Sequence, residues 1–370
     1  MRLFLRAGFA VALLAAACKD SPGPIDFTDP AAITANLGAL DSAFDSDVYR
    51  SFSVAAGALD PAAPSAALQP AARLLGGTLP GLNRQSKSPY VMTLGRTQQL
   101  QDLAPQMSVA ATAGRIIPDS MYGRVFQWDA ALDVYTWQDS VIPGLTGVRF
   151  LLYQVVDGVV TEPVVEVGTL DLIDASTPST LRLHVLVKGV GGNPVYVDYT
   201  TTVTATSTSV RATANGFLSN GLTAAANKTL DFDETFYVTQ TGASVDASFT
   251  LNNPPVTFTL HESVTFGTES LVVSVTFRIV QPGETVSFSG RVAINYETNS
   301  VTVHAAVRLN GRTVATFDGD PDTAQWVDAG GEPLTADDLT ALEGLNAAAA
   351  QFVLVVTELF SPIGIFFAAA

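Results

Sequence analysis

Alternation of apolar and polar residues between about Tyr122 and Phe317 is the feature that most restricts the fold of this chain. A period of two places successive side chains on opposite faces of a β-strand. The polar positions are mostly Ser and Thr, so each strand has one apolar and one hydrated face. The clearest apolar rows are Val195, Val197, Tyr199 and Val203; Val245, Ala247, Phe249 and Leu251; Leu271, Val273, Val275, Phe277 and Ile279; and Val301, Val303, Ala305, Val307 and Leu309.

Turn signals divide this region into short strands. The strongest is Asn310-Gly311, a pair typical of two-residue hairpins, and further signals are Gly189 to Pro194, Thr241-Gly242 and Glu297 to Ser300. Their spacing predicts roughly 12 to 14 strands. No helical pattern lies between the strands, so we expect an antiparallel meander without parallel crossovers.

Two apolar stripes with helical spacing flank the β region. The first predicts a helix over residues 30–56, ending at Gly57, followed by an Ala-, Pro- and Gly-rich segment to Pro89. The second predicts a helix over residues 334–361, which Thr335 and Asp338 cap and Pro362 ends. We expect the very apolar segment Phe352 to Phe367 to be buried; the alternative is a second membrane anchor.

These elements predict a mainly β fold, a curved sheet or incomplete barrel covered by an N-terminal and a C-terminal amphipathic helix. The alternative is two β-sandwich domains divided near Thr208. The first architecture is similar to the half-barrel of periplasmic lipoprotein-carrier and lipid-binding lipoproteins. The expected boundaries are a signal peptide over 1–17, a lipidated tether over 18–28, a helical and loop cover over 29–119, and a β domain with its C-terminal helix over 120–370.

The first twenty residues have the features of an export signal. Arg2 and Arg6 precede an uncharged run, Ala7 to Ala17, which is too short to span a membrane and ends at Cys18, the only cysteine. Ala15-Ala16-Ala17-Cys18 resembles the lipobox of bacterial lipoprotein precursors, although that class usually has a larger aliphatic residue where Ala15 stands. The resemblance implies that Cys18 is acylated and anchors the protein in the cell envelope. Lys19, in place of an aspartate, favours the outer membrane; the alternative is an ordinary signal peptide cleaved near Ala17.

Charge restricts the partners of the mature chain. The formal net charge is −16, and removal of a signal peptide that holds Arg2 and Arg6 makes it more negative. Such a chain repels nucleic acid and anionic membrane surfaces, so membrane association has to come from the lipid. The sequence contains no recognisable cofactor motif.

Few residues indicate chemistry. His184, His261 and His304 fall on the polar faces of three separate strands, without metal-ligand spacing, and no G-x-S-x-G motif is present. Asp318, Asp320 and Asp322 resemble the start of a calcium loop, but Thr323 and Ala329 replace its glycine and glutamate. We therefore interpret this segment as a polar turn, with a weak calcium site as the alternative.

Two carboxylates interrupt apolar faces. Glu234 shares a face with Phe232 and Phe236, and Glu262 shares one with Phe258 and Val264. Because a carboxylate on an apolar face is costly unless paired or protonated, we expect a bulge or a rim position that turns each outward. The alternative is a polar spot within a cavity.

The sequence therefore predicts a lipid-anchored envelope protein, a non-catalytic module that binds or assembles. Its partner is a hydrophobic small molecule or an envelope protein, and the binding place is an apolar cavity under the N-terminal helix, with that helix as a movable lid. A structural or adhesive scaffold is the alternative. A hydrolase is less favoured.

Overall fold

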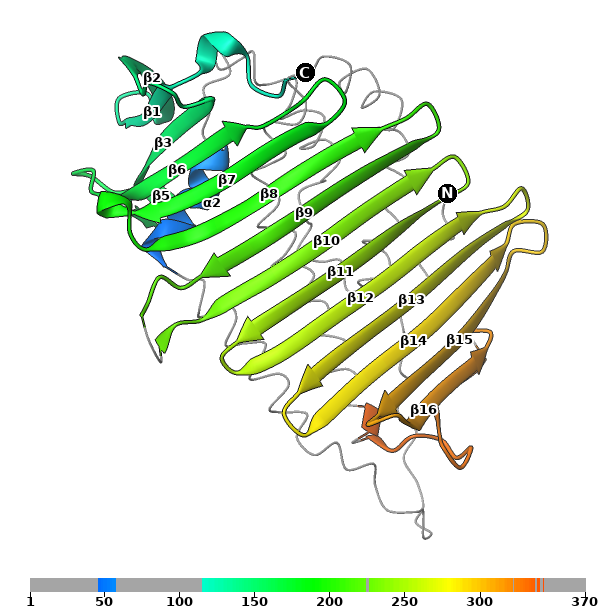
Figure 1. Cartoon of the computed structure of the whole chain (residues 1–370). Coiled ribbons are helices and arrows are strands. Elements are labelled where there is room, and N and C mark those ends of the chain that lie inside the picture. Colours follow the sequence, from blue (N-terminus) through cyan, green and yellow to red (C-terminus); the bar gives the residue numbers. More distant parts are fainter. Residues whose placement is uncertain are drawn as a thin grey trace.

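The computed structural model describes residues 46–57, 115–223, 226–321, 323–336, 338, 339 and 342. Figure 1 shows a long sheet of neighbouring strands. The helical elements are α2 (Asp47–Gly57), η2 (Asp119–Met121) and η3 (Val190–Gly192). The strands are β1 (Arg124–Asp129), β2 (Val134–Val141), β3 (Gly147–Tyr153), β4 (Val155–Val156), β5 (Val159–Val160), β6 (Glu166–Asp174), β7 (Leu181–Gly189), β8 (Val195–Ala205), β9 (Ser209–Ser219), β10 (Thr229–Thr239), β11 (Gly242–Asn252), β12 (Pro255–Phe266), β13 (Ser270–Gln281), β14 (Glu284–Asn295), β15 (Ser300–Leu309), β16 (Arg312–Gly319) and β17 (Val327–Asp328).

Fifteen of these strands form one open sheet, in which β6 to β17 lie in sequence order. Each of these strands pairs antiparallel with its neighbour, as the alternation predicts. The sheet has one strand more than the expected 12 to 14, because β17 lies after Phe317 and adds to the 14 strands that begin between Tyr122 and Phe317. The two-sandwich alternative is wrong, since β8 and β9 pair directly across Thr208 in this sheet.

The first strands depart from the expected meander. The order at this edge is β6-β3-β1-β2, and β1 pairs parallel with β3 through Val125 and Arg149. The expectation of purely antiparallel pairing is wrong here. The chain leaves β2 and crosses the β1–β2 hairpin to place β3 on the far side of β1, so β3 runs in the direction of β1. The short β4–β5 hairpin forms a separate two-stranded sheet.

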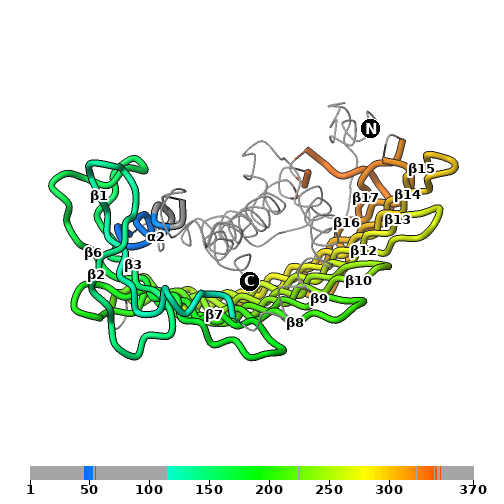
Figure 2. The backbone as a smooth tube through the Cα atoms, turned by 90° about the horizontal axis from the view of Figure 1, so that it is seen from above, coloured from blue at the N-terminus to red at the C-terminus, as the bar shows by residue number. Residues whose placement is uncertain are grey.

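Seen from above, the sheet is curved, and α2 lies on its concave side (Figure 2). The apolar rows face this concave side. Val197, Tyr199, Phe249 and Leu271 are buried, whereas the alternate positions on the convex face are partly or fully exposed. The alternation in the sequence therefore assigns the two faces correctly.

Helix α2 is fixed to the sheet by packing and by hydrogen bonds. Its buried positions include Val48, Phe52 and Ala55, at helical spacing, and it packs against β3, β4 and β6. The Tyr153 N–H donates to Ser51 Oγ at 2.9 Å, and the Ser219 N–H donates to the Tyr49 hydroxyl at 3.1 Å. The prediction of a loosely held N-terminal lid is wrong for α2, because its inner face is buried and bonded to the sheet.

The predicted helical cover of the whole sheet is not seen in the described residues. Residues 29–45 and 343–361, on which most of that prediction falls, lie outside them, as do the signal peptide and the lipidated tether. The start of the C-terminal helix is described: the Asp338 N–H donates to Thr335 Oγ1 at 3.2 Å, and Thr335 Oγ1 donates to Asp338 Oδ2 at 2.6 Å. This is the predicted capping pair. Within the described ranges, no helix is long and apolar enough to cross a bilayer.

Candidate ligand-binding face

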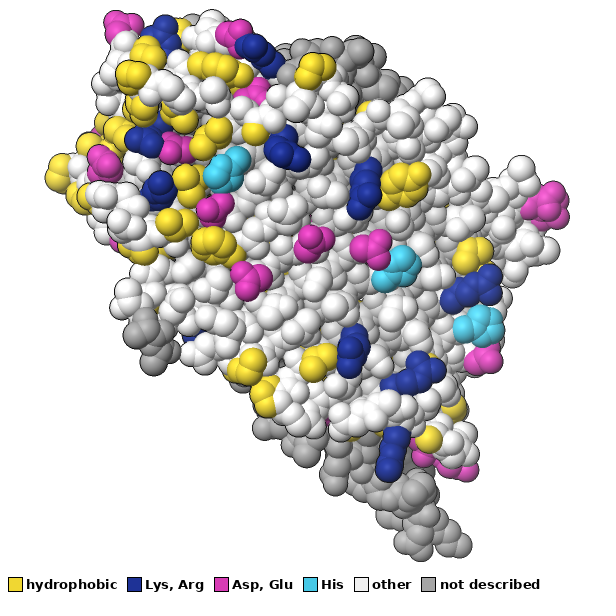
Figure 3. Space-filling model, viewed as in Figure 1, with side chains coloured by type: hydrophobic (Ala, Val, Ile, Leu, Met, Phe, Trp, Pro, Cys, Tyr) yellow, Lys and Arg dark blue, Asp and Glu magenta, His cyan; other side chains and the backbone are white. Residues whose placement is uncertain are grey.

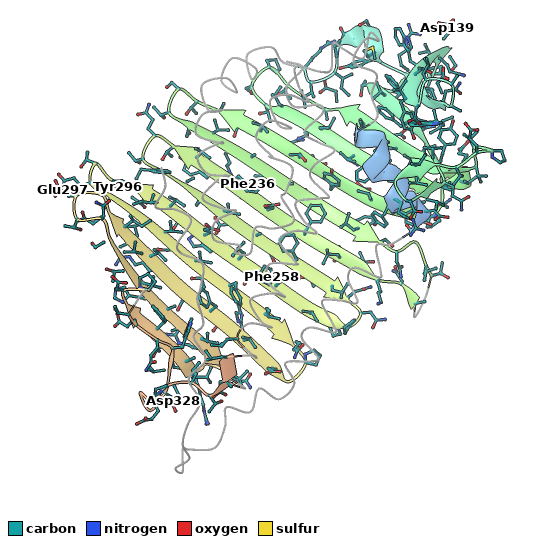
Figure 4. All side chains as sticks on the ribbon, turned by 180° about the vertical axis from the view of Figure 1, so that it is seen from behind. Asp139, Phe236, Phe258, Tyr296, Glu297 and Asp328 are labelled. Atoms are coloured by element: carbon teal, nitrogen blue, oxygen red, sulfur yellow. The ribbon has the colours of Figure 1, made fainter. Side chains whose placement is uncertain are left out.

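The concave face of β8–β14 combines apolar, aromatic and buried polar side chains. Figure 4 looks onto this face and shows Phe236 and Phe258 on the side of the sheet where α2 lies. Among the described helices, α2 packs at one end of the sheet, on β3, β4 and β6. The concave face of β8–β14 lies beyond that contact, and its composition makes it the candidate site.

An aromatic row crosses this face perpendicular to the strands. Ring centroids of successive members lie 5.1 to 6.5 Å apart, the separation of interacting aromatic pairs. Burial raises the pKa of the Tyr199 hydroxyl well above its usual value, so this group stays protonated. The row consists of Tyr199, Phe232, Phe249, Phe258, Phe277 and Phe288.

Two glycines make room for the row. Gly216 lies on β9 between Tyr199 and Phe232, at φ 155°, and a Cβ there would lie 2.3 Å from the Tyr199 Cβ. Glycine is therefore required for the Tyr199 ring to meet Phe232 across β9. On β14, a Cβ at Gly290 would lie 2.8 Å from the Phe288 ring. These glycines interrupt the apolar alternation because aromatic rings cover them.

A polar line runs beside the aromatic row, on β8, β10 and β12. Thr201, Glu234 and Glu262 are each buried, and both glutamates are only 3% exposed. Thr201 and Glu234 pair with Ala214 of β9 from opposite sides. Glu234 pairs next with Ala247 of β11, and Val245 of the same strand pairs with Glu262. Small or short side chains thus separate the polar groups.

The expected bulge or rim position is wrong for both glutamates. β10, β11 and β12 pair in unbroken register, and both residues lie well inside their strands. Each carboxylate is therefore directed to the apolar side by the regular alternation of the strand. A carboxylate on that side costs free energy unless a partner or a proton compensates for it. The polar line is thus a group of buried polar side chains on an otherwise apolar face.

Glu284 is a third buried carboxylate on the concave face of β8–β14, and sequence reasoning missed it. It is 6% exposed at the start of β14, on the face of the fully buried Val286. Its Oε2 accepts a hydrogen bond from Gln281 Nε2 at 3.1 Å across the turn. The sequence does indicate this position, because Glu284, Val286 and Phe288 are alternate residues of one strand and therefore lie on the same face of β14.

Each histidine on the convex face has an aspartate from the neighbouring strand. His184 Nε2 lies 2.8 Å from Asp198 Oδ1, and His261 Nδ1 lies 2.6 Å from Asp246 Oδ1. His304 Nδ1 lies 2.7 Å from Asp318 Oδ1. The three histidines remain on separate parts of the face. In the described part of the chain, no three His, Cys, Asp or Glu side chains form a group suited to a metal.

The His261 pair has the residue types of a catalytic triad, but its setting is unsuitable. Thr276 of β13 lies opposite His261, so Thr276, His261 and Asp246 form a row across three strands. More than half of the surface of both His261 and Asp246 side chains is exposed. The backbone N–H groups there are engaged in strand pairing, and an acyl-transfer site needs free donors for its oxyanion. The geometry does not favour hydrolysis.

The acidic segment after β16 forms a turn. The Asp320 carbonyl accepts the Ala324 N–H at 2.8 Å, and Asp318 faces His304. Asp322 lies outside the described residues. Asp318 is thus engaged with a histidine on the strand, and the interpretation as a polar turn agrees with this geometry.

No known protein family, curated protein or solved structure matches this chain. Its function has to be argued from its own residues.

Proposed function

We propose that this protein is a lipid-anchored, non-catalytic protein of the bacterial cell envelope, which holds a hydrophobic ligand on the concave face of its sheet. The observation that carries the proposal is the pairing of an aromatic row with a polar line on one curved face. Ligand sites are mostly apolar, with a few polar groups that fix orientation. An amphipathic molecule satisfies both parts, with its apolar body along the rings and hydrogen-bond donors toward Glu234 and Glu262.

The anchor is the acyl group proposed on Cys18. An uncharged run after two arginines and before the only cysteine supports it, and Lys19 supports placement in the outer membrane. The test is mass spectrometry of the mature N-terminus. We expect an acylated Cys18, and Cys18→Ser should leave an unprocessed or non-acylated protein. An unmodified mature terminus at another residue would contradict the anchor.

The cover of the candidate face is proposed to be the C-terminal helix, over residues 334–361. Leu334 is buried, and Leu339 and Leu342 pack against the same apolar cluster as Phe258. The sequence continues that apolar stripe to Phe360.

Ligand binding is tested by enlarging a small side chain next to Glu234 on the concave face. Ala247→Leu adds side-chain volume between Glu234 and Leu260, whereas the control Ser248→Leu adds the same group type on the convex face of β11. We expect a fluorescent fatty acid to bind the Cys18→Ser protein and its Ser248→Leu form. In the Ala247→Leu form, we expect affinity to fall at least tenfold without loss of the fold.

Two results would overturn the ligand proposal. One is absence of probe binding together with absence of lipid in an organic extract of the purified protein. The other is equal binding by the Ala247→Leu and Ser248→Leu forms. Either result would favour the second candidate, a structural scaffold, which the regular and stacked aromatic row also suits.

A further inference from the structure

The convex face carries mostly aspartates on β8–β11 and arginines on β13–β15. Figure 3 shows dark-blue side chains over β13–β16, and magenta ones over the neighbouring strands. The acidic half, on β8–β11, contains Asp198, Asp231, Asp233 and Asp246. The basic half, on β13–β15, contains Arg278, Arg291 and Arg308. The overall acidity of the chain therefore does not exclude a local group of three arginines, and we name these three the arginine patch.

The arginine patch lacks carboxylate partners within the described residues. All three side chains are exposed, and none of them forms an ion pair there, whereas Arg149 makes a two-bond contact with Asp171 at 2.5 and 2.6 Å. The three histidines of the same face each have an aspartate. In a chain with 35 acidic and 19 basic residues, carboxylates are abundant. The three arginines therefore leave their charge available to a partner. Arg278 and Arg308 lie close together, and Arg291 lies four residues farther along β14 than Ser287, which lies between them.

Hydroxyl groups lie between the arginines. Arg278 and Arg308 pair with Ser287 of β14 from its two sides, so their Cα atoms are two strand spacings apart, roughly 10 Å. Arg308 Nη1 donates to Ser289 Oγ at 3.4 Å. Thr276, opposite Ser289, and Thr259, opposite Arg278, extend the hydroxyl surface. The patch thus offers guanidinium forks separated by small groups that both donate and accept hydrogen bonds.

We infer that the arginine patch binds an anionic polysaccharide. Guanidinium groups recognise carboxylates through two parallel hydrogen bonds, and the intervening Ser and Thr hydroxyls suit the hydroxyls of sugar rings. A convex surface cannot enclose a small molecule, but an extended polymer can lie across the strands. The inference concerns the face opposite the proposed ligand site and is independent of it.

The test measures retention of the full-length acylated protein, in neutral detergent, on immobilised alginate, neutral dextran and double-stranded DNA. We expect binding to alginate alone, weakening as salt rises because exposed charges are screened. The double variant Arg278→Gln and Arg308→Gln should lower alginate affinity at least tenfold. The matched control is Arg211→Gln, which removes an exposed arginine from the same face on β9 and should change affinity less than twofold.

Three results would overturn the inference. Equal retention on alginate and dextran would exclude a role for charge. Equal retention on alginate and DNA would show a general polyanion surface instead of a polysaccharide site. Equal losses in the patch variant and in Arg211→Gln would show that total charge, and not the patch, determines binding. Thermal unfolding of both variants at the wild-type temperature verifies that the losses are not due to unfolding.

Discussion

The two ends of the sheet are built differently. The first end, α2 with β1–β7, contains a parallel pair, register shifts and a separate hairpin. Individual polar contacts fix it: Asp174 Oδ2 accepts the N–H groups of Ile116 and Ile117 at 2.8 and 3.0 Å, and its Oδ1 accepts the Ser176 N–H at 2.9 Å. The second end, β9–β16, consists of long strands in a nearly continuous antiparallel register.

The two ends show that the sequence can fix the strand order and faces of one sheet in two ways. At the irregular end, a few buried polar groups determine where the chain turns and where α2 lies. At the regular end, the alternation of apolar and polar residues and the aromatic row determine, strand after strand, which face is buried. The regular end therefore presents two continuous faces, one apolar and one hydrated, and both proposed binding surfaces lie there.

The largest expected effect is at the regular end. Phe258 is 2% exposed in the middle of the aromatic row, so Phe258→Ala should lower the free energy of unfolding by about 3–5 kcal/mol. Thr259→Ala, its exposed neighbour on the convex face, should change it by less than about 0.5 kcal/mol. Urea unfolding measures both. A loss at Phe258 as small as that at Thr259 would mean that the row does not stabilise the sheet.

At the irregular end, Asp174→Ala should destabilise by about 3 kcal/mol. The substitution leaves the buried N–H groups of Ile116 and Ile117 without their acceptor. The control is Asp233→Ala, which removes an exposed carboxylate from β10. Denaturant midpoints for both variants check this prediction, and similar midpoints would contradict the proposed role of single polar contacts at this end.

Alkaline pH should distinguish the ends because buried tyrosines lie toward the first. Burial raises the pKa of Tyr49 and Tyr135, both at the first end, above the usual 10.0. Above pH 10 the unfolded chain loses protons that the folded protein keeps, so stability falls as pH rises, by about 1.4 kcal/mol per pH unit for each tyrosine. Urea unfolding from pH 9 to 11.5 measures the slope, and Tyr135→Phe should reduce it. If the dependence of the unfolding free energy on pH were unchanged in Tyr135→Phe, the raised pKa of Tyr135 would be contradicted.

The smallest effect is expected for the histidine–aspartate pairs. His261 and Asp246 are both more than half exposed, and such pairs contribute about 0.5 kcal/mol or less. His261→Gln should therefore leave the urea midpoint nearly unchanged. A loss of more than about 2 kcal/mol would show that the convex face, and not only the concave one, determines the stability of the regular end.

The sequence was most informative where the chain repeats itself. Leu271, Val273 and Phe277 lie on the buried face as predicted, and Asn310-Gly311 forms the two-residue turn between β15 and β16, with φ 49° and 80°. The parallel pairing of β1 and β3 was not predictable, because it depends on where the β1–β2 hairpin docks. The fixed position of α2 depends on the Tyr49 hydroxyl reaching β9, and no local pattern indicates that contact.

The candidate site was predicted in part. The alternation places Glu234 and Glu262 on the apolar faces of their strands. It could not exclude a bulge at each residue, because alternation alone does not show whether the strand register is continuous. His261 and Asp246 lie opposite each other because of the register between β11 and β12 around the Asn253-Pro254 turn. This contact can be predicted only when that register is known. The arginine patch was missed because its residues, on β13, β14 and β15, come together only when the registers of two hairpins are combined.

We propose that the mature protein carries lipid in two ways, covalently on Cys18 and non-covalently on the concave face. Mass spectrometry of one preparation under denaturing and native conditions tests both. We predict a denatured mass equal to the chain from Cys18 plus its acyl groups, and a native mass larger by one bound lipid, which Ala247→Leu removes. Equal native and denatured masses would contradict the ligand-binding account and leave a lipid-anchored scaffold.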